Sequence, residues 1–336
     1  MMKMMGRVWT AGLLALLTLT GAEADEYRLG EGVQVGKTPL YLGGYFSLNY
    51  WNNFKGTSEV VVDDLAVMLY GSKGAWSGLA EVEWGDLYRK RYGYGAQTDI
   101  DGTPHAERVF AQYEPSERLQ VTFGKFNTPV GYWNRMPVNV LRDTTSSPRI
   151  TEEVFPRFTT GIDAKIMTGI VSVNVLIQMT PDLDAAFNGD NLYNNFDIER
   201  QSGIGVTLEQ GVWSCGVNAG RYEEWVEEES WSYLYASGQY RTAQTRIMAE
   251  AGYRQNDDNT RSNAGGYIQG SQQFFMKHYA VLRLEYTTDY IANSDDSIAV
   301  VGYTYRPLFP VALKGEYQFH TRENEDMMMV SFSMLF

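Results

Sequence analysis

Apolar and polar residues alternate with a period of two along most of this chain. Segment 76–84 places five residues on one face: Trp76, Gly78, Ala80, Val82 and Trp84. Glu81 and Glu83 lie on the opposite face. Successive side chains of a β-strand point to opposite sides, so the pattern predicts a strand with one apolar and one polar face.

The same alternation recurs to the end of the sequence and predicts about sixteen strands. Their centres lie near residues 46, 66, 80, 110, 121, 163, 174, 204, 216, 236, 249, 267, 283, 301, 315 and 332. Short connections typical of tight turns lie at 70–76, 113–119, 208–213 and 305–311, between longer polar stretches. Short turns at one rim and long loops at the other are typical of membrane β-barrels.

Alternation by itself is compatible with two architectures, a soluble sandwich whose charged faces meet water and a transmembrane barrel whose charged faces line a wet lumen. Trp76 and Trp84 are spaced to span roughly 20 Å along a membrane normal, at about 3.3 Å per residue and a tilt near 40°. We interpret them as parts of an aromatic girdle. The predicted fold class is all-β, a single transmembrane antiparallel β-barrel wide enough for an aqueous channel.

The final segment also has one apolar and one polar face. Val330, Phe332, Met334 and Phe336 share one parity, whereas Ser331 and Ser333 share the other. An exposed apolar strand would invite aggregation, so it needs a partner. We expect it to pair with the first strand, around 40–51, which closes the barrel and turns the serines toward the wet interior.

Residues 1–24 have the features of a secretory signal peptide. Lys3 and Arg7 precede an apolar run at 8–19, and Ala22-Glu23-Ala24 matches the small-x-small cleavage rule. The alternative, an N-terminal anchor helix, is disfavoured because this run is too short for a bilayer of about 30 Å. We therefore predict a signal peptide at 1–24 and one barrel domain at 25–336.

Composition narrows the classes of function. The 336 residues carry 28 Lys plus Arg and 41 Asp plus Glu, a net charge of −13, which argues against a nucleic-acid partner. The chain has one cysteine and three histidines, without a nucleophile motif or a haem-attachment motif nearby. We predict no enzyme activity, no catalytic residues, no metal and no cofactor.

One segment interrupts the alternation. Residues 127–158 form a long connection between the predicted fifth and sixth strands, and connections of this length are usually functional. The stretch 124–158 has five basic and three acidic residues, a local charge of +2. Its apolar residues need something to pack against, so we predict an inward-folding constriction loop. The alternative is a loop on the outer surface.

An inward loop would bring its basic residues near the polar faces of the strands. Opposed charges would create a transverse field, and the loop's positive charge would permit a mild preference for anions. The predicted pore-lining and constriction residues are Lys125, Arg135, Arg142, Arg149, Arg157, Glu81, Glu83, Arg246, Glu250, Arg283, Glu285, Lys314 and Glu316.

The leader, the amphipathic strands and the final aromatic residue together resemble the Gram-negative outer-membrane porins. Segment 121–134, VTFGKFNTPVGYWN, is similar to a motif of the phosphate-selective type, matched here by Gly124, Lys125, Pro129 and Gly131. The basic ladder of a phosphate channel is not evident, so phosphate specificity is not carried over. The resemblance implies that barrel-assembly machinery reads an assembly signal formed by Val330, Phe332, Met334 and Phe336.

The predicted function is therefore an outer-membrane porin, a multi-pass channel for passive diffusion of small hydrophilic solutes and ions. The resemblance also implies a homo-trimer in contact with outer-membrane lipid and lipopolysaccharide. Three alternatives remain open: a non-conducting barrel (adhesin, anchor or partner sleeve), a barrel enzyme, and a soluble periplasmic or secreted ligand-binding β-protein.

Overall fold

The computed structural model describes residues 29–184, 194–225, 228–289, 294–322 and 325–336. The predicted signal peptide at 1–24 lies outside the described residues. Within the described ranges, none of the helices is long and apolar enough to span a membrane.

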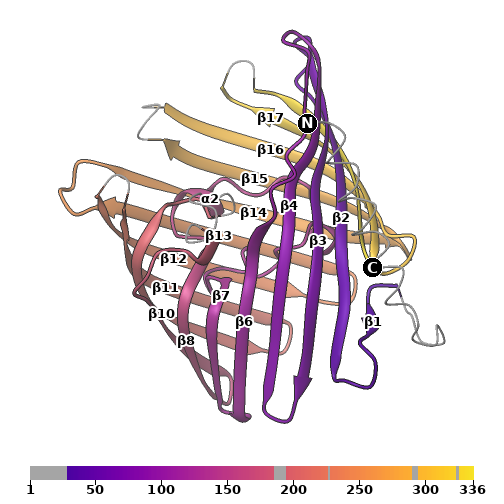
Figure 1. The fold of residues 1–336 in the computed structure, drawn as a ribbon. Helices are drawn as coiled ribbons and strands as arrows, with labels where there is room; N and C mark the ends of the chain where they lie inside the picture. The colour runs from indigo at the N-terminus through magenta and orange to yellow at the C-terminus, as the bar shows by residue number, and fades with distance from the viewer. Residues whose placement is uncertain (1–28, 185–193, 226–227, 290–293, 323–324) are drawn as a thin grey trace, which may run out of the picture.

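The described strands form a single antiparallel sheet of eighteen strands, sixteen of which close into a barrel. Each predicted centre falls inside one of these sixteen strands, so the predicted all-β barrel is confirmed (Figure 1). The barrel strands are β2 (Leu40–Asn52), β3 (Thr57–Lys73), β4 (Trp76–Gly93), β6 (His105–Ser116), β7 (Leu119–Asn127), β8 (Phe158–Thr168), β9 (Val171–Gln178), β10 (Ile198–Gln210), β11 (Trp213–Glu224), β12 (Ser230–Arg241), β13 (Thr245–Asn256), β14 (Ser262–Phe275), β15 (His278–Asp289), β16 (Ser294–Tyr305), β17 (Val311–His320) and β18 (Met327–Leu335).

Two short strands lie outside the barrel count. β1 (Val33–Gln34) pairs with β2, and β5 (Gln97–Asp99) pairs with the far end of β4. β5 lies in the polar stretch 88–105, where the absence of alternation predicts a long loop. The hairpins β3–β4, β6–β7, β8–β9, β10–β11 and β14–β15 turn through two residues each, and they share one rim, which we name the turn end. The turns β12–β13 and β16–β17 lie at the same rim and have three and five residues, and the remaining connections lie at the opposite rim, the loop end.

The two faces of the strands differ as predicted. On β15, Leu282 and Leu284 are half exposed on the outside, whereas Arg283 and Glu285 are 1% and 6% exposed on the inside. An apolar outer surface and a charged interior are the reverse of a soluble protein, and this distribution is typical of a barrel surrounded by lipid.

The barrel closes where β18 pairs with β2 over eight residue pairs, from Met328 with Asn52 to Leu335 with Tyr45. Phe336 extends the ladder through two backbone hydrogen bonds with Gly44, at 2.8 and 2.9 Å. Ser331 and Ser333 face inward, but both are 1% exposed and do not face water. Ser331 lies within hydrogen-bonding distance of the Thr145 hydroxyl, at 2.6 Å, because another segment covers this part of the wall.

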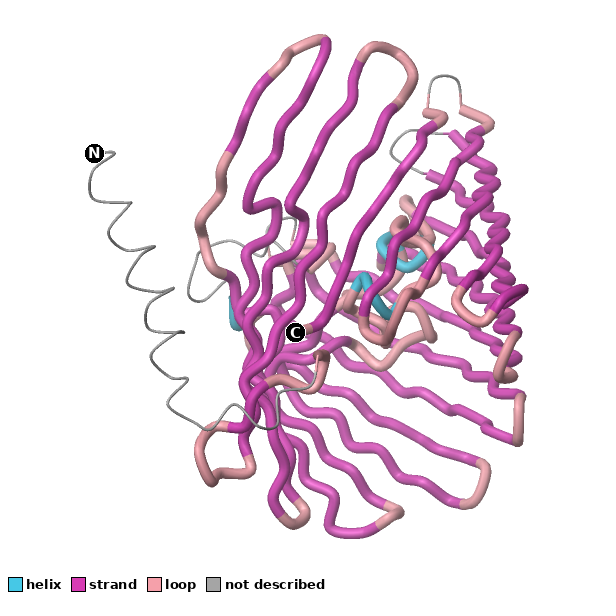
Figure 2. The backbone as a smooth tube through the Cα atoms, turned by 90° about the vertical axis from the view of Figure 1, so that its right-hand side faces the viewer, coloured by secondary structure: helices cyan, strands magenta, loops and turns pink. Residues whose placement is uncertain are grey.

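That covering segment is 128–157, between β7 and β8, the fifth and sixth barrel strands. It contains a 3-10 turn, η3 (Asn139–Leu141), and the short helix α2 (Ile150–Glu153). Figure 2 shows helical turns within the ring of strands. The apolar side chains of the segment pack against inward aromatic residues of β11 to β14; this shared core includes Val130, Trp133, Ile150, Val154, Phe155, Tyr222, Trp231, Tyr233, Tyr235 and Tyr267.

Closure at the β18–β2 seam depends on a glycine. A Cβ added to Gly44 would lie 2.2 Å from the Ala66 carbonyl oxygen and 2.7 Å from the Phe336 ring. We expect Gly44→Ala to lower the free energy of unfolding by about 1–3 kcal/mol, the usual cost of overpacking. Urea unfolding followed by heat-modifiable gel mobility measures this change. Gly315→Ala is the matched control because open space surrounds that Cβ position, and equal destabilisation of both variants would contradict the prediction.

Candidate functional site

Three inward carboxylates anchor segment 128–157 through its backbone. Glu316 accepts hydrogen bonds from the amides of Thr145 and Ser146, at 2.8 and 3.1 Å. Glu285 accepts one from the Arg149 amide at 2.9 Å, and Glu250 accepts hydrogen bonds from the amides of Tyr132 and Trp133. The sequence predicts that these carboxylates oppose the arginine side chains of the segment. Instead they bind its peptide groups, whose burial without partners would be costly.

Inward cations of β15 and β17, the strands that carry Glu285 and Glu316, also hold this segment. Arg283 donates to the Ser146 carbonyl oxygen and to the Thr144 hydroxyl, both at 2.8 Å, and it also pairs with Glu285. Lys314 donates to the Thr144 carbonyl oxygen at 3.2 Å and to Asn139. Buried cations need such partners, because an uncompensated charge is expensive in a dry environment.

Arg246 provides a further anchor by pairing with Asp143 of the segment, with Nε and Oδ2 3.0 Å apart. Burial raises the pKa of Asp143, but Arg246, with help from Ser271 and Arg306, outweighs burial, so that this pKa lies below its usual value. Burial also lowers the pKa of Arg142, and the nearby Arg157 adds to this effect. Asp143 of the segment is thus paired with Arg246, whereas Arg142 and Arg157 lie near each other.

A cavity of about 310 Å³ lies between the segment and the barrel wall, and we name it the charged cavity. Its wall side is formed by Tyr45, Asp63, Asp64, Glu83, Gly85, Asp86 and Glu107 of β2, β3, β4 and β6. Its segment side is formed by Pro137, Asn139, Arg142, Thr145, Ser147, Glu152 and Arg157. Carboxylates therefore face two arginines across the cavity.

Several of these wall residues could not be predicted from the alternation, because irregularities in strand pairing determine where their side chains point. The registers of β3 with β2 and with β4 shift at Asp63, and the register of β4 with β6 shifts at Glu107. A β-bulge adds a residue to one strand and re-aims its side chain. As a result, neighbouring residues such as Asp63 and Asp64 both face inward, which breaks the period of two. The one available signal was a pair of aspartates inside an otherwise apolar strand.

Hydrogen bonds order the carboxylate wall. The Tyr45 hydroxyl donates toward Glu107 at 2.6 Å and also contacts Glu83. Ser47 and Asn49 donate to Asp64 and Asp63 at 2.6 and 2.7 Å. Glu81, two residues before Glu83 on β4, is not part of the cavity lining and accepts a hydrogen bond from Arg108.

The remaining basic residues predicted for the site lie elsewhere. Lys125 is buried and pairs with Asp182 at 2.6 Å. Arg135 lines a different hollow near the turn end, together with Glu209 and Trp213. Arg149 lies near the loop end, where it pairs with Glu325 at 2.8 Å. The arginines of segment 128–157 thus lie at different depths, and only Arg142 and Arg157 share the charged cavity.

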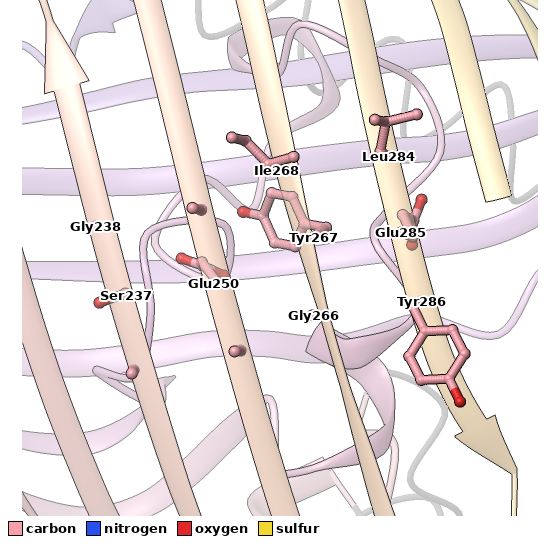
Figure 3. Close-up of a pocket in the computed structure, with 12 residues that line it drawn as sticks. Ser237, Gly238, Glu250, Gly266, Tyr267, Ile268, Leu284, Glu285 and Tyr286 are labelled. Carbon is pink, nitrogen blue, oxygen red and sulfur yellow. The ribbon is translucent and has the colours of Figure 1, made fainter. Parts of the chain in front are cut away.

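A larger hollow, of about 640 Å³, lies over β12 to β15 (Figure 3). It owes its depth to small residues on the outward face: Ala236, Gly238, Ala249, Ala251 and Gly266. Leu284 and Tyr286 of β15 border it on one side. The hollow belongs to the outer surface of the barrel and is not part of the interior.

Outward aromatic residues pair on neighbouring strands near the turn end. Trp76 is 51% exposed and contacts Tyr113, with ring centroids 4.6 Å apart. Trp213 is 64% exposed and contacts Tyr240 at the same distance. Trp84, further along β4, is half-buried.

The pair formed by Asp143 and Arg246 gives a pH-dependent prediction. Asp143→Asn leaves Arg246 without its counter-charge, so we expect the free energy of unfolding at pH 7 to fall by about 3 kcal/mol. Because the pKa of Asp143 is lowered in the folded protein, its stabilisation exists above the unfolded pKa of about 3.9 and is lost as the pH falls further. Urea unfolding at pH 7 and at about pH 3 measures the difference.

The matched control is Asp257→Asn, which removes the exposed partner of Arg221 and should change stability by less than about 1 kcal/mol. A difference between wild type and Asp143→Asn that stays unchanged at about pH 3 would contradict the assignment.

Comparison of the sequence with protein-family models and with curated proteins finds no match. Solved structures do match. OmpF of Salmonella typhi, in complex with daunomycin, has a TM-score of 0.65 at 11% identity, over 88% of this chain and 97% of that chain. The anion-selective porin from Comamonas acidovorans gives 0.62 at 11% identity, over 88% and 98%. The outer membrane channel DcaP of Acinetobacter baumannii gives 0.58 at 10%, over 91% and 99%. The chain therefore has the fold of the sixteen-stranded outer-membrane porins.

Proposed function

We propose that this protein is a Gram-negative outer-membrane porin, a water-filled channel for passive diffusion of small hydrophilic solutes and ions. Segment 128–157 narrows its lumen, and the charged cavity is the narrow passage. The observation that carries the proposal is the charged cavity itself, a polar space inside a closed barrel with carboxylates on one side and Arg142 and Arg157 on the other. A charged, wet interior behind an apolar outer surface is what a diffusion channel requires.

The charges of the cavity suggest what passes most easily. Its lining includes six carboxylates, Asp63, Asp64, Glu83, Asp86, Glu107 and Glu152, against two arginines. Rings of carboxylates favour cations, so we propose a preference for cations instead of the mild anion preference that the segment's own charge permits. The opposed charges also create a transverse field, which dipolar solutes tolerate better than apolar ones.

The remaining inward charges have a different role in this proposal. Glu250, Glu285, Glu316, Arg246, Arg283 and Lys314 hold segment 128–157 in place. Support comes from hydrogen bonds of five of these side chains to backbone groups between Tyr132 and Arg149, and from the pair that Arg246 forms with the Asp143 side chain. A constriction tied at so many points is fixed rather than a hinged lid.

We propose the outer membrane as the location, with lipid and lipopolysaccharide around the barrel and Trp76 and Trp84 in an aromatic girdle. The exposed apolar outer face and the aromatic pairs near the turn end support this setting. We also propose that barrel-assembly machinery recognises Val330, Phe332, Met334 and Phe336, and that the protein is a homo-trimer. A structural neighbour, OmpT of Vibrio cholerae, is described in a trimer form.

The first experiment is a conductance measurement. Purified, heat-modifiable protein in planar bilayers should give single-channel currents, and a salt gradient should give a reversal potential of the sign expected for cation preference. A correctly folded barrel without conductance would contradict the porin function. That outcome would favour the non-conducting alternative, an adhesin, an anchor or a partner sleeve.

A second experiment tests the polarity of the cavity. The double variant Arg142→Ala, Arg157→Ala removes the two cavity arginines, so we expect the cation-to-anion permeability ratio to rise about twofold or more. Arg221→Ala is the control, because Arg221 lies on β11 outside the cavity and is half exposed beside Asp257. Equal reversal potentials for wild type and the double variant would show that the cavity does not govern selectivity.

A further inference from the structure

Three buried carboxylates converge in the wall behind and beside the charged cavity. Glu81 and Glu83 of β4 and Glu107 of β6 are 0%, 2% and 5% exposed. Each of the three offers an oxygen that lies within 4.8 Å of the oxygens from the other two. The geometry arises because the shifted register at Glu107 brings an extra inward carboxylate opposite the alternating pair on β4.

The described residues leave this cluster short of positive charge and of donors. Arg108 binds one oxygen of Glu81, Oε2. The Tyr45 hydroxyl has a single proton for its two carboxylate neighbours, Glu83 and Glu107. Three like charges this close repel one another strongly in a buried environment.

A separate observation points to a missing ligand. The other Glu81 oxygen, Oε1, is fully buried and has no hydrogen-bond partner. Buried polar atoms are nearly always satisfied, and an ionised oxygen left alone is costly. A bound cation would satisfy this oxygen and remove the repulsion within the cluster at the same time.

We propose that Glu81, Glu83 and Glu107 bind one divalent cation of the calcium type. The ligands are oxygens only, which suits hard cations such as Ca²⁺ rather than zinc or copper. Ca²⁺–oxygen distances of about 2.3–2.6 Å place two ligands of one ion at most about 5 Å apart, consistent with the spacing of the three carboxylates. Calcium takes about six to eight oxygen ligands, and the Tyr45 oxygen and water molecules supply those that the three carboxylates do not.

The site has a consequence for the channel, and this second part rests on the proposed porin function. Glu83 and Glu107 line the charged cavity, opposite Arg142 and Arg157. A bound Ca²⁺ cancels their negative charge and leaves the two arginines of the facing side in place. Calcium binding therefore shifts the selectivity of the channel from cations toward anions.

The binding test uses protein refolded from inclusion bodies, so that no lipopolysaccharide contributes calcium sites. Equilibrium calcium binding should give one Ca²⁺ per wild-type chain, with a dissociation constant at or below about 10⁻³ M, as in extracellular calcium modules. Glu83→Gln and Glu107→Gln should weaken binding at least about tenfold, because each removes one charged ligand. Heat-modifiable mobility checks that each variant is folded.

Glu59→Gln is the matched control. Glu59 is a buried carboxylate on the inner wall, paired with Arg91 and outside the cluster, so the same change of charge should leave calcium binding intact. Wild-type protein that binds no calcium at about 5 mM overturns the proposal, whatever the variants do. Calcium binding that Glu83→Gln and Glu107→Gln leave unchanged overturns the assignment to these residues.

The selectivity test measures reversal potentials in a potassium chloride gradient, with and without about 5 mM calcium chloride. The wild-type potassium-to-chloride permeability ratio should fall about twofold with calcium, and that of Glu107→Gln should not change. A conducting wild-type channel that is insensitive to calcium overturns the selectivity part. Protein that binds calcium without conducting overturns the porin function and the selectivity part, and it supports the metal site.

Discussion

The hydrogen-bonded pairing of β18 with β2 is the interaction on which the rest of this structure depends. It joins the two ends of the sheet, so that these two strands leave no row of unpaired backbone groups exposed to lipid. Each unpaired backbone group in the bilayer core would cost roughly several kcal/mol. Closure also divides the side chains of every strand into an outer apolar set and an inner polar set. Gly44 is part of that constraint because the Phe336 ring occupies the place of its missing side chain.

Closure creates an interior that segment 128–157 must enter without leaving its own peptide groups unsatisfied. The barrel solves this problem with charged side chains from facing strands. Glu250, Glu285 and Glu316 accept from backbone amides, whereas Arg283 and Lys314 donate to backbone carbonyl oxygens. Buried charges that look like pore-lining residues in the sequence are thus largely structural. The charges that line the charged cavity gather between Arg142 and the carboxylates of β3, β4 and β6, and in the proposed channel these are the charges that solutes meet.

Features of this fold that depend on neighbouring residues were predictable from the sequence, whereas features that depend on how distant strands pair were not. Strand positions were predictable because alternation with period two is a property of neighbouring residues, and each of the sixteen barrel strands has a stretch that follows it. The inward direction of Glu81, Glu83, Glu250 and Glu285 was predictable for the same reason. The inward direction of Asp63 and Glu107 was not predictable, because a bulge depends on how two strands pair and leaves no regular pattern in either sequence. Tyr45 gains its role only because its ring reaches across β3 to the carboxylates of β4 and β6.

By itself, the sequence determined that this chain forms amphipathic strands, that their apolar faces point one way, and that one long connection of opposite charge interrupts them. These properties depend on residue type and spacing, which are local. Only the tertiary structure decided which charges meet. It placed Arg142 and Arg157 in the charged cavity, Arg135 near the turn end and Arg149 near the loop end, although all four belong to one connection or its edge. The reason is physical: electrostatic interactions act through space, and distances across a barrel are set by strand register and loop path, which no short stretch of sequence contains.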